Sequence, residues 1–336
     1  MDNRITRESN WAKKSSTIQY SHQVFNRAIQ KTNISADQNE KCDPILTAKK
    51  LEALKKNAKH IISRDELESE TTRVKELTIQ GKFLDLMTEE DQSITWKSSM
   101  FSFPKGVLAW ALRACTDSLP TQANLARWNK VIDNKCKLCI VNGNPSVIGT
   151  LHHILNACPI LLERYTWRHD SVLTYVTKQL TSSLMHEEYL YADLEGFRLN
   201  DGTIPSDILP TASRPDIVIV DKKKSPTEVT IIELTVPFEP NINKAEKRKT
   251  DRYAGLVLDI QGRGFNVSAI NLEIGSRGYI NVRNKLALKS LLRKMRCKNI
   301  AQTILDISRI SLLSSFSIYH SRQDSAWVKP PVMSPN

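Results

Sequence analysis

Apolar residues recur at helical spacing through the first part of the chain. In residues 1–95 they are sparse and separated by lysines, which predicts a helical arm or linker. Residues 96–135 are more apolar, and Pro104 and Pro120 bracket a predicted helix, because proline is disfavoured inside one. A second helix is predicted over residues 121–131. We find no candidate chemistry before residue 96.

The second half of the chain alternates between helical and strand-like spacing. A helix is predicted over residues 160–185, followed by strands and turns between residues 189 and 236. A helix over residues 241–258 and a strand over residues 265–273 come next. Leucines at helical spacing then predict an amphipathic helix over residues 282–295.

This order of elements predicts an α+β protein in five segments. A small metal-binding segment separates the helical part from a domain with a mixed central sheet flanked by helices. The predicted segments are residues 1–95, a helical arm or linker; 96–135, a helical linker; 136–160, the metal-binding segment; 161–310, the α/β domain; and 311–336, a loose C-terminal tail.

The net charge of the chain indicates what kind of partner it binds. The 336 residues include 48 lysines and arginines against 36 acids, which gives a net charge of +12. A basic protein of this kind favours a polyanion, most commonly nucleic acid. No apolar run is long enough to span a membrane, and no apolar core follows Met1, so neither a membrane anchor nor a secretory signal is expected.

Cysteines and histidines gather between residues 136 and 158. Cys136 and Cys139 are two residues apart, the spacing of a thiolate pair on zinc, and His153 and Cys158 follow within the same short window. His152 competes with His153 for the third position; the shorter spacing to Cys158 favours His153. A closed four-ligand site predicts structural Zn²⁺ in a reducing compartment.

Several cations near this cluster are candidates for binding nucleic acid. Lys135 and Lys137 flank the first cysteine, as expected for a zinc module that positions nucleic acid. Arg127 precedes Trp128, and the pair could stack on a base, although a tryptophan is more often part of the core.

Two predicted strands each carry an acid that an ordinary core strand would not hold. In residues 228–236 the two-residue period places Glu233 on an otherwise apolar face. Asp216 begins the preceding strand, over residues 214–220, directly after a proline. Buried acids on neighbouring strands suggest a shared Mg²⁺. In the usual nuclease arrangement a lysine comes two residues after the Glu, but here that position is Thr235.

A cation can instead come from the helix that follows. Lys249 and Tyr253 are four residues apart and therefore share a face of the helix over residues 241–258. We expect Lys249 to supply the charge beside the acids and Tyr253 to pack or hydrogen-bond next to it. The alternative is an ordinary surface helix whose charges are solvated.

Together these residues resemble the C-terminal part of non-LTR retrotransposon polyproteins, the site-specific type with a restriction-like endonuclease. The resemblance covers most of the chain, is strongest over residues 77–279, and rests on the order of its motifs rather than on any one of them. In this order they are Leu77–Gly81, Asp117–Thr121 and Asn124–Trp128; Cys136, Cys139, His153 and Cys158; Arg168-His169-Asp170; Arg214–Asp216; Glu233–Thr235; Lys249 and Tyr253; and Leu272–Gly278. In this family the active-site lysine also lies away from its usual position two residues after the Glu, so Thr235 at that position is compatible with the resemblance.

The resemblance implies a CCHC zinc knuckle in residues 136–160 and a PD-(D/E)xK nuclease fold in residues 161–310. It implies a nuclear, Mg²⁺-dependent endonuclease that nicks target DNA to prime reverse transcription, with the RNA of the element as a further partner. Asp216 and Glu233 would hold Mg²⁺, and Lys249 and Tyr253 would complete the catalytic set. The implied nucleic-acid contacts are Arg168, His169, Arg214, Lys247, Arg248 and Arg252.

The family's polymerase is not expected in these residues. Its paired-aspartate turn has no counterpart, since residues 191–194 contain Asp193 alone and follow the cysteine cluster. We therefore expect a fragment or remnant with linker, knuckle and endonuclease. The alternative function is a catalytically inactive relic that only binds nucleic acid. A structural, partner-binding helical protein would account for residues 1–95 but not for the two acids.

Overall fold

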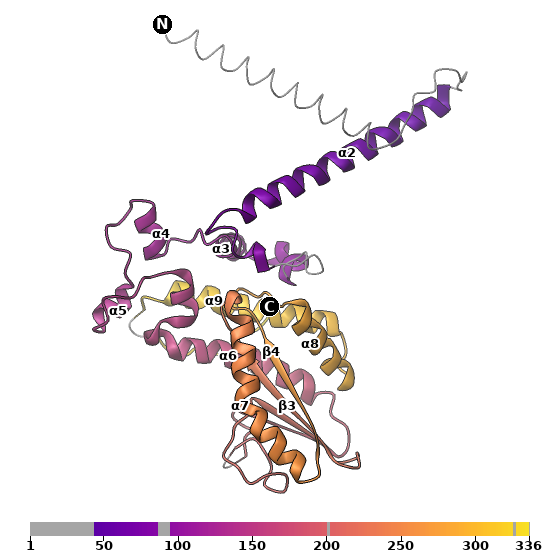
Figure 1. Ribbon diagram of the computed structural model, residues 1–336, viewed down its shortest axis with the longest axis vertical. Helices are drawn as coiled ribbons and strands as arrows, with labels where there is room; N and C mark the ends of the chain where they lie inside the picture. Colours follow the sequence, from indigo (N-terminus) through magenta and orange to yellow (C-terminus); the bar gives the residue numbers. More distant parts are fainter. Residues whose placement is uncertain (1–43, 87–94, 200–201, 325–326, 336) are drawn as a thin grey trace. The chain divides into compact units, whose positions relative to one another are not determined.

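The computed structural model describes residues 44–86, 95–199, 202–324 and 327–335. The chain divides into two compact units, Met1–Thr78 and Ile79–Asn336. In the first unit the structure describes one long helix, α2 (Pro44–Lys75), which confirms helix in this part of the predicted arm (Figure 1). Residues 1–43 of that arm lie outside the described residues. The boundary between the units falls before the predicted segment boundary at residue 95.

The second unit begins with short helices. They are η1 (Leu84–Leu86), η2 (Thr95–Ser102), α3 (Lys105–Cys115), α4 (Gln122–Arg127) and α5 (Lys137–Val141). Helix α3 follows Pro104, as predicted. Helix α4 is shorter than predicted, because the backbone turns to a positive φ at Asn129. Trp128 is partly exposed, which contradicts the expectation of a core position.

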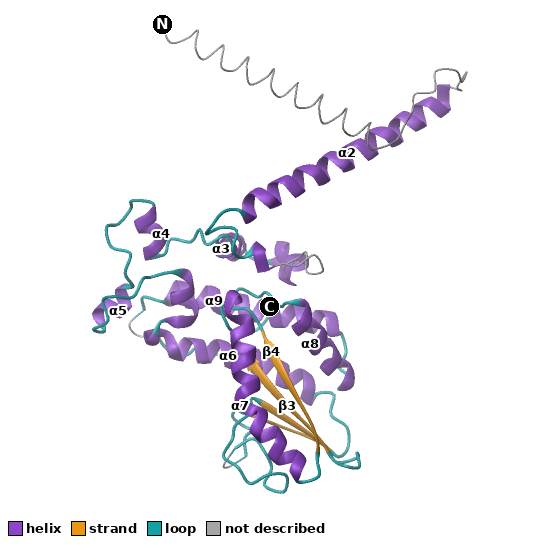
Figure 2. Cartoon of the chain, viewed as in Figure 1, coloured by secondary structure: helices purple, strands orange, loops and turns teal. Residues whose placement is uncertain are grey.

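A mixed four-stranded sheet is the centre of the second unit, as predicted (Figure 2). Its strands lie in the order β1 (Glu188–Ala192), β2 (Ile217–Asp221), β3 (Glu228–Thr235) and β4 (Asn266–Glu273). The first two pairings are antiparallel, and β3 pairs with β4 in parallel. The parallel pairing requires a crossover, which α7 (Ile242–Gly262) supplies.

Helices cover both faces of the sheet, so the two central strands, β2 and β3, are buried on both sides. One face, with Val218 and Ile231, packs against apolar residues of α7 such as Ile260. The opposite face packs against three helices. These are α6 (Leu162–Thr181), α8 (Val282–Lys294) and α9 (Ile300–Ser321). Burial on both faces accounts for the nearly continuous apolar runs in β2 and β3.

Helix α9 corrects the predicted C-terminal boundary. The helix runs through residue 310, the expected end of the α/β domain, and continues to Ser321. Leu312, Ile318 and Tyr319 are buried beyond that point. The tail therefore begins after Ser321 rather than at residue 311.

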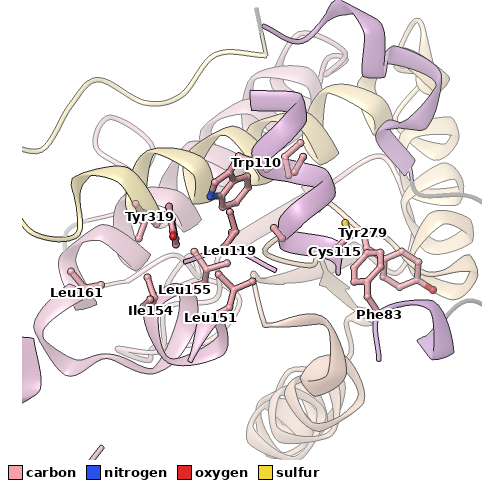
Figure 3. Packing of buried hydrophobic residues seen from close by; sticks show 14 of the residues in the cluster. Phe83, Trp110, Cys115, Leu119, Leu151, Ile154, Leu155, Leu161, Tyr279 and Tyr319 are labelled. Carbon is pink, nitrogen blue, oxygen red and sulfur yellow. The ribbon is translucent and has the colours of Figure 1, made fainter. Parts of the chain in front are cut away.

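The linker helices pack against the sheet domain through a second core. Trp110 and Leu119 belong to one buried cluster with Leu151, Leu155 and Tyr319 (Figure 3). Apolar burial of about 25 cal/mol per Å² makes such a cluster a main source of stability. The linker is thus an integral part of the second unit.

A buried ion pair crosses the same interface. Arg277 donates to Glu239 Oε2 at 2.6 Å and to the carbonyl of Ala114 at 3.0 Å, and both charged side chains are at most 3% exposed. The Arg277 guanidinium lies 4.4 Å from the ring centre of Phe83 and 4.2 Å from that of Phe238. Such a pair stabilises only while both partners are present, because each alone would be an uncompensated buried charge.

Candidate functional site

Three cysteines and one histidine surround a single point. Cys136, Cys139, His153 and Cys158 are all buried, and their ligand atoms lie within 4.8 Å of one another. Cys139 Sγ is 3.3 Å from His153 Nε2 and 3.8 Å from Cys158 Sγ. A tetrahedral zinc, with bonds of roughly 2.3 Å to sulfur and roughly 2.0–2.1 Å to nitrogen, requires similar ligand separations. The cluster could therefore hold a metal ion such as zinc.

The local fold brings these four side chains together. Cys136 precedes α5, whose first turn places Cys139 beside it, and Gly143 ends α5 with a φ of 80°. His153 begins a short helix that ends before Cys158. The Tyr165 hydroxyl accepts from the Cys158 N–H at 3.1 Å and donates to backbone carbonyls of that helix. Hydrogen bonds of this kind orient the first ligands of a metal site.

The two adjacent histidines have different roles. His153 is the one in the cluster, as favoured by the sequence. His152 turns away; its Nε2 lies 3.2 Å from Asn241 Nδ2, and its ring packs on Phe238 at 5.0 Å between centres. Burial lowers the pKa of His152. His152, the alternative zinc ligand, thus packs against Asn241 and Phe238 and is not part of the Cys₃His cluster.

The two strand acids meet at the same end of the sheet. Ile217 pairs with Ile232 across β2 and β3, so Asp216 and Glu233 occupy the next paired position and face the same side. The Asp216 N–H lies 3.3 Å from Glu233 Oε1, and the Leu234 N–H donates to Asp216 Oδ2 at 2.7 Å. These contacts bring together the two acids that the sequence singled out.

Lys249 reaches the acids from α7. Its Nζ lies 2.5 Å from Glu233 Oε2 and 5.8 Å from the ring centre of Tyr253. Burial and Asp216 raise the pKa of Glu233 to about 7, against the opposing effects of Lys249 and a hydrogen bond with Tyr253. Burial and Glu233 raise the pKa of Tyr253, so its hydroxyl remains a neutral donor. The i,i+4 pair predicted on this helix therefore adjoins the acids.

His169 lies beside Asp216, a position that the sequence did not reveal. Its Nε2 is 3.5 Å from Asp216 Oδ1, and its Nδ1 is 3.3 Å from Asp170 Oδ1. Burial lowers the pKa of His169, but hydrogen bonds to Asp170 and Asp216 outweigh burial and raise it to about 10. Burial raises the pKa of Asp216, and His169 and Lys249 bring it below its ordinary value.

Arg168 requires a correction. The sequence suggested a nucleic-acid contact, but this side chain is 1% exposed. It donates to Ser315 Oγ at 2.9 Å and to the carbonyl of Val236 at 3.2 Å, and burial lowers its pKa to about 10. Arg168 joins α6, α9 and the end of β3, and it does not reach the surface.

Of the other proposed nucleic-acid contacts, His169 and Lys135 are half-buried and the rest are exposed. Those that are exposed are Arg127, Lys137, Arg214, Lys247, Arg248 and Arg252. Lys135 is half-buried, and its Nζ lies 3.3 Å from the Ser146 carbonyl. A cleft of about 830 Å³ leads to Lys249; Lys244 and Arg248 line it on one side, and His152 and His169 line it elsewhere. Lys249, which contacts Glu233, thus lines a cleft bordered by cations, whereas Glu233 itself lines a second cavity.

A third buried acid adjoins this region. Glu273 ends β4, is 2% exposed, and lines a cavity of about 640 Å³ together with Glu233 and Glu246. Burial and Glu246 raise the pKa of Glu273 to about 7. The segment Leu272–Gly278 contributed to the resemblance, but the apolar pattern alone gives Glu273 no role.

Glu273 predicts a pH-dependent change in stability. Its folded pKa of about 7 lies above its ordinary value, so the folded state holds an extra proton between about pH 4.5 and 7, and stability falls as the pH rises through this window. Glu273→Gln should therefore raise the free energy of unfolding by about 1–3 kcal/mol at pH 8 and by much less at pH 5. Urea unfolding without added divalent cations measures this difference.

The exposed Asp259 of α7 supplies the control. Asp259→Asn should change stability equally little at both pH values, because its carboxylate is solvated in both states. An equal effect of Glu273→Gln at pH 5 and pH 8 would contradict the buried, protonated acid.

Among the described residues, no helix combines the length and apolar character needed to cross a membrane. Neither a comparison with protein-family models nor a search of curated proteins finds a match to this chain.

Proposed function

We propose that the chain is a retrotransposon-derived, Mg²⁺-dependent DNA endonuclease that acts in the nucleus. It would nick a DNA target and free a 3′-hydroxyl for reverse transcription by a polymerase, with element RNA as a second partner. The observation that carries this proposal is the convergence of Asp216, Glu233 and Lys249 at one end of the sheet, beside a helix with exposed cations.

The donor set suits a hard divalent cation. Asp216 and Glu233 offer carboxylate oxygens, and Mg²⁺ is commonly held by one or two carboxylates and water. When bound, the ion would polarise the phosphate and make water more acidic. Lys249 places its amino group beside Glu233, where it would screen the phosphate or orient the water. Tyr253 holds Glu233 through its hydroxyl.

The fold supports the same proposal. A mixed sheet flanked by helices is the architecture expected for a PD-(D/E)xK domain, and β2 and β3 place the two acids at paired positions. The Cys₃His cluster would act as the zinc knuckle. Asn156, between its last two ligands, donates to the Val236 carbonyl at 2.8 Å, just beyond β3. His152 and Asn156 of the knuckle segment line the same cleft as Lys249.

The cations of α7 predict salt-dependent binding. Lys247, Arg248 and Arg252 are exposed next to Lys249. Replacing these three by glutamine should weaken DNA binding and reduce the slope of log K against log salt by about 3, close to one per lost phosphate contact. Fluorescence anisotropy of a labelled duplex between 50 and 200 mM salt, the range in which such contacts change affinity by orders of magnitude, measures the slope.

A matched triple variant tests whether location matters. Lys222, Lys223 and Lys224 lie in the turn between β2 and β3, and their replacement by glutamine removes the same net charge. This control should leave the slope within about one unit of wild type. Equal losses in the two triple variants would show attraction by net charge alone and would contradict a binding face on α7.

One observation favours the alternative, a relic that binds nucleic acid without cutting it. Glu233 Oε2 is held by Lys249, and Asp216 Oδ1 faces His169, so both acids already have protein partners. Nicking of supercoiled plasmid in Mg²⁺ at low salt separates the two functions. Relaxed circles formed by wild type support the endonuclease; salt-sensitive binding without nicking supports the relic.

A further inference from the structure

A second buried oxygen accompanies Glu273 at the carboxyl ends of β3 and β4. Thr235 is paired with Glu273 in the parallel register, so the two side chains lie on the same face as Glu233. Thr235 Oγ1 and Glu273 Oε1 are both buried and have no hydrogen-bond partner among the described residues. Buried polar atoms are nearly always partnered, so two orphaned oxygens at paired strand positions are both available to a bound ion or water.

The surroundings select the kind of ligand. Glu273 and Glu246 place two carboxyl groups at one cavity, and Arg283 pairs with Glu246 while its side chain stays 74% exposed. Lys249 is held by Glu233 at 2.5 Å. Glu273 borders this cavity, and Thr235 borders the neighbouring cleft beside Lys249. The two orphaned groups are a carboxylate and a hydroxyl, oxygen donors that a hard cation prefers.

The backbone fixes this site independently of the first acid pair. The Glu273 N–H donates to Asn284 Oδ1 at 3.0 Å, and Asn281 caps α8 by accepting from the Asn284 N–H at 2.8 Å. The backbone of Glu273 is thus held at the junction of β4 and α8, whereas Asp216 directly precedes β2. The two groups of acids share only the neighbourhood of Glu233.

We propose that Thr235 and Glu273 form a second divalent-cation site, with Glu246 as an outer acid, that takes Mg²⁺ or Mn²⁺. One carboxylate oxygen and one hydroxyl would bind directly, and water would fill the remaining positions, as is common for Mg²⁺. Thr235 occupies the position two residues after Glu233, where a nuclease usually has its lysine. In place of the charge of that lysine, this position would then provide a hydroxyl ligand to a divalent cation. This proposal does not require that the protein cut DNA.

Mn²⁺ alone is the probe, and the zinc-loaded full chain is the protein. The double variant Asp216→Asn, Glu233→Gln removes the first proposed site and should still bind one Mn²⁺. Binding is measured as the decrease of the electron spin resonance signal of free Mn²⁺. Adding Glu273→Gln should weaken that binding at least about tenfold, and adding Thr235→Val should do so as well, on the scale known for altered metal sites. Adding Asp259→Asn instead should change nothing.

Folding is checked in the same samples. Each variant should keep its zinc, and Mn²⁺ should raise the melting temperature of the double variant but not of the variant with Glu273→Gln added. Unchanged Mn²⁺ affinity after Glu273→Gln, or no Mn²⁺ on the double variant, would overturn the proposal. Failure of wild type to nick DNA would overturn the endonuclease and leave these binding results intact.

Discussion

Asp216→Asn should lower the rate of Mg²⁺-dependent plasmid nicking by about 10²–10³-fold or more, the scale for loss of one key electrostatic group in a catalytic site. Asparagine has the size of aspartate but no charge. It would bind the cation weakly and leave Glu233 as the only carboxylate of the proposed cation site. The Leu234 N–H that now donates to Asp216 at 2.7 Å can still donate to an amide oxygen. The loss of activity should therefore exceed any loss of folded protein: the variant should keep its circular dichroism spectrum at the assay temperature, with a lower melting temperature because His169 loses a charged partner.

Asp221 provides the matched control for this experiment. It lies on the same strand, at the end opposite Asp216, and pairs in register with Glu228. Asp221→Asn should nick at the rate of wild type, measured as the conversion of supercoiled to relaxed circles over time. Full activity of Asp216→Asn alongside this control would exclude Asp216 from the chemistry. No activity in any of the three proteins would favour the binding module.

Loss of the Cys₃His cluster should have the largest effect on folding. Structural zinc binds with on the order of 10 kcal/mol, and that energy becomes folding energy because the site does not exist in the unfolded chain. Cys139→Ser removes a buried ligand whose Sγ lies close to both His153 and Cys158. We expect about one zinc per wild-type chain, almost none in the variant, and a much lower melting temperature.

His152 is the matched control, because it adjoins His153 and lies outside the cluster. His152→Gln should keep its zinc, measured by elemental analysis of the purified protein. A wild-type protein that folds and melts normally without zinc would exclude a structural metal. Loss of zinc in His152→Gln with full zinc in Cys139→Ser would mean that the ligands are assigned wrongly.

The sequence predicted those site residues whose signals are local. Glu233 interrupts a two-residue apolar period, and Lys249 and Tyr253 share a face through the four-residue helical period, so each could be found within one element. The pairing of β2 and β3 follows from their short connection. His169 reaches Asp216 from α6, a helix far away in the sequence, and no local pattern encodes that contact.

Buried polar residues explain why the sequence predicted neither helix α9 nor the buried position of Arg168. Helix α9 was missed because Ser308, Ser311, Ser314 and Ser315 interrupt its apolar pattern, although all four are buried. Ser311 donates to the carbonyl of Gly275 at 2.8 Å, Ser308 donates to that of Gly278, and Ser315 accepts from Arg168, so three of these hydroxyls have partners in the interior. The nucleic-acid contact of Arg168 was implied by the resemblance, and residue type alone does not distinguish a buried guanidinium from an exposed one.

The ion pair of Arg277 and Glu239 determines how the protein can be divided for experiments. Arg277 also depends on Ala114 and Phe83, which belong to the helical segment before the cysteines. A truncation that starts at Cys136 would remove Ala114 and Phe83. The Arg277–Glu239 ion pair and one side of the hydrophobic core would then be exposed to solvent. Recombinant work on the second unit should therefore begin no later than Ile79.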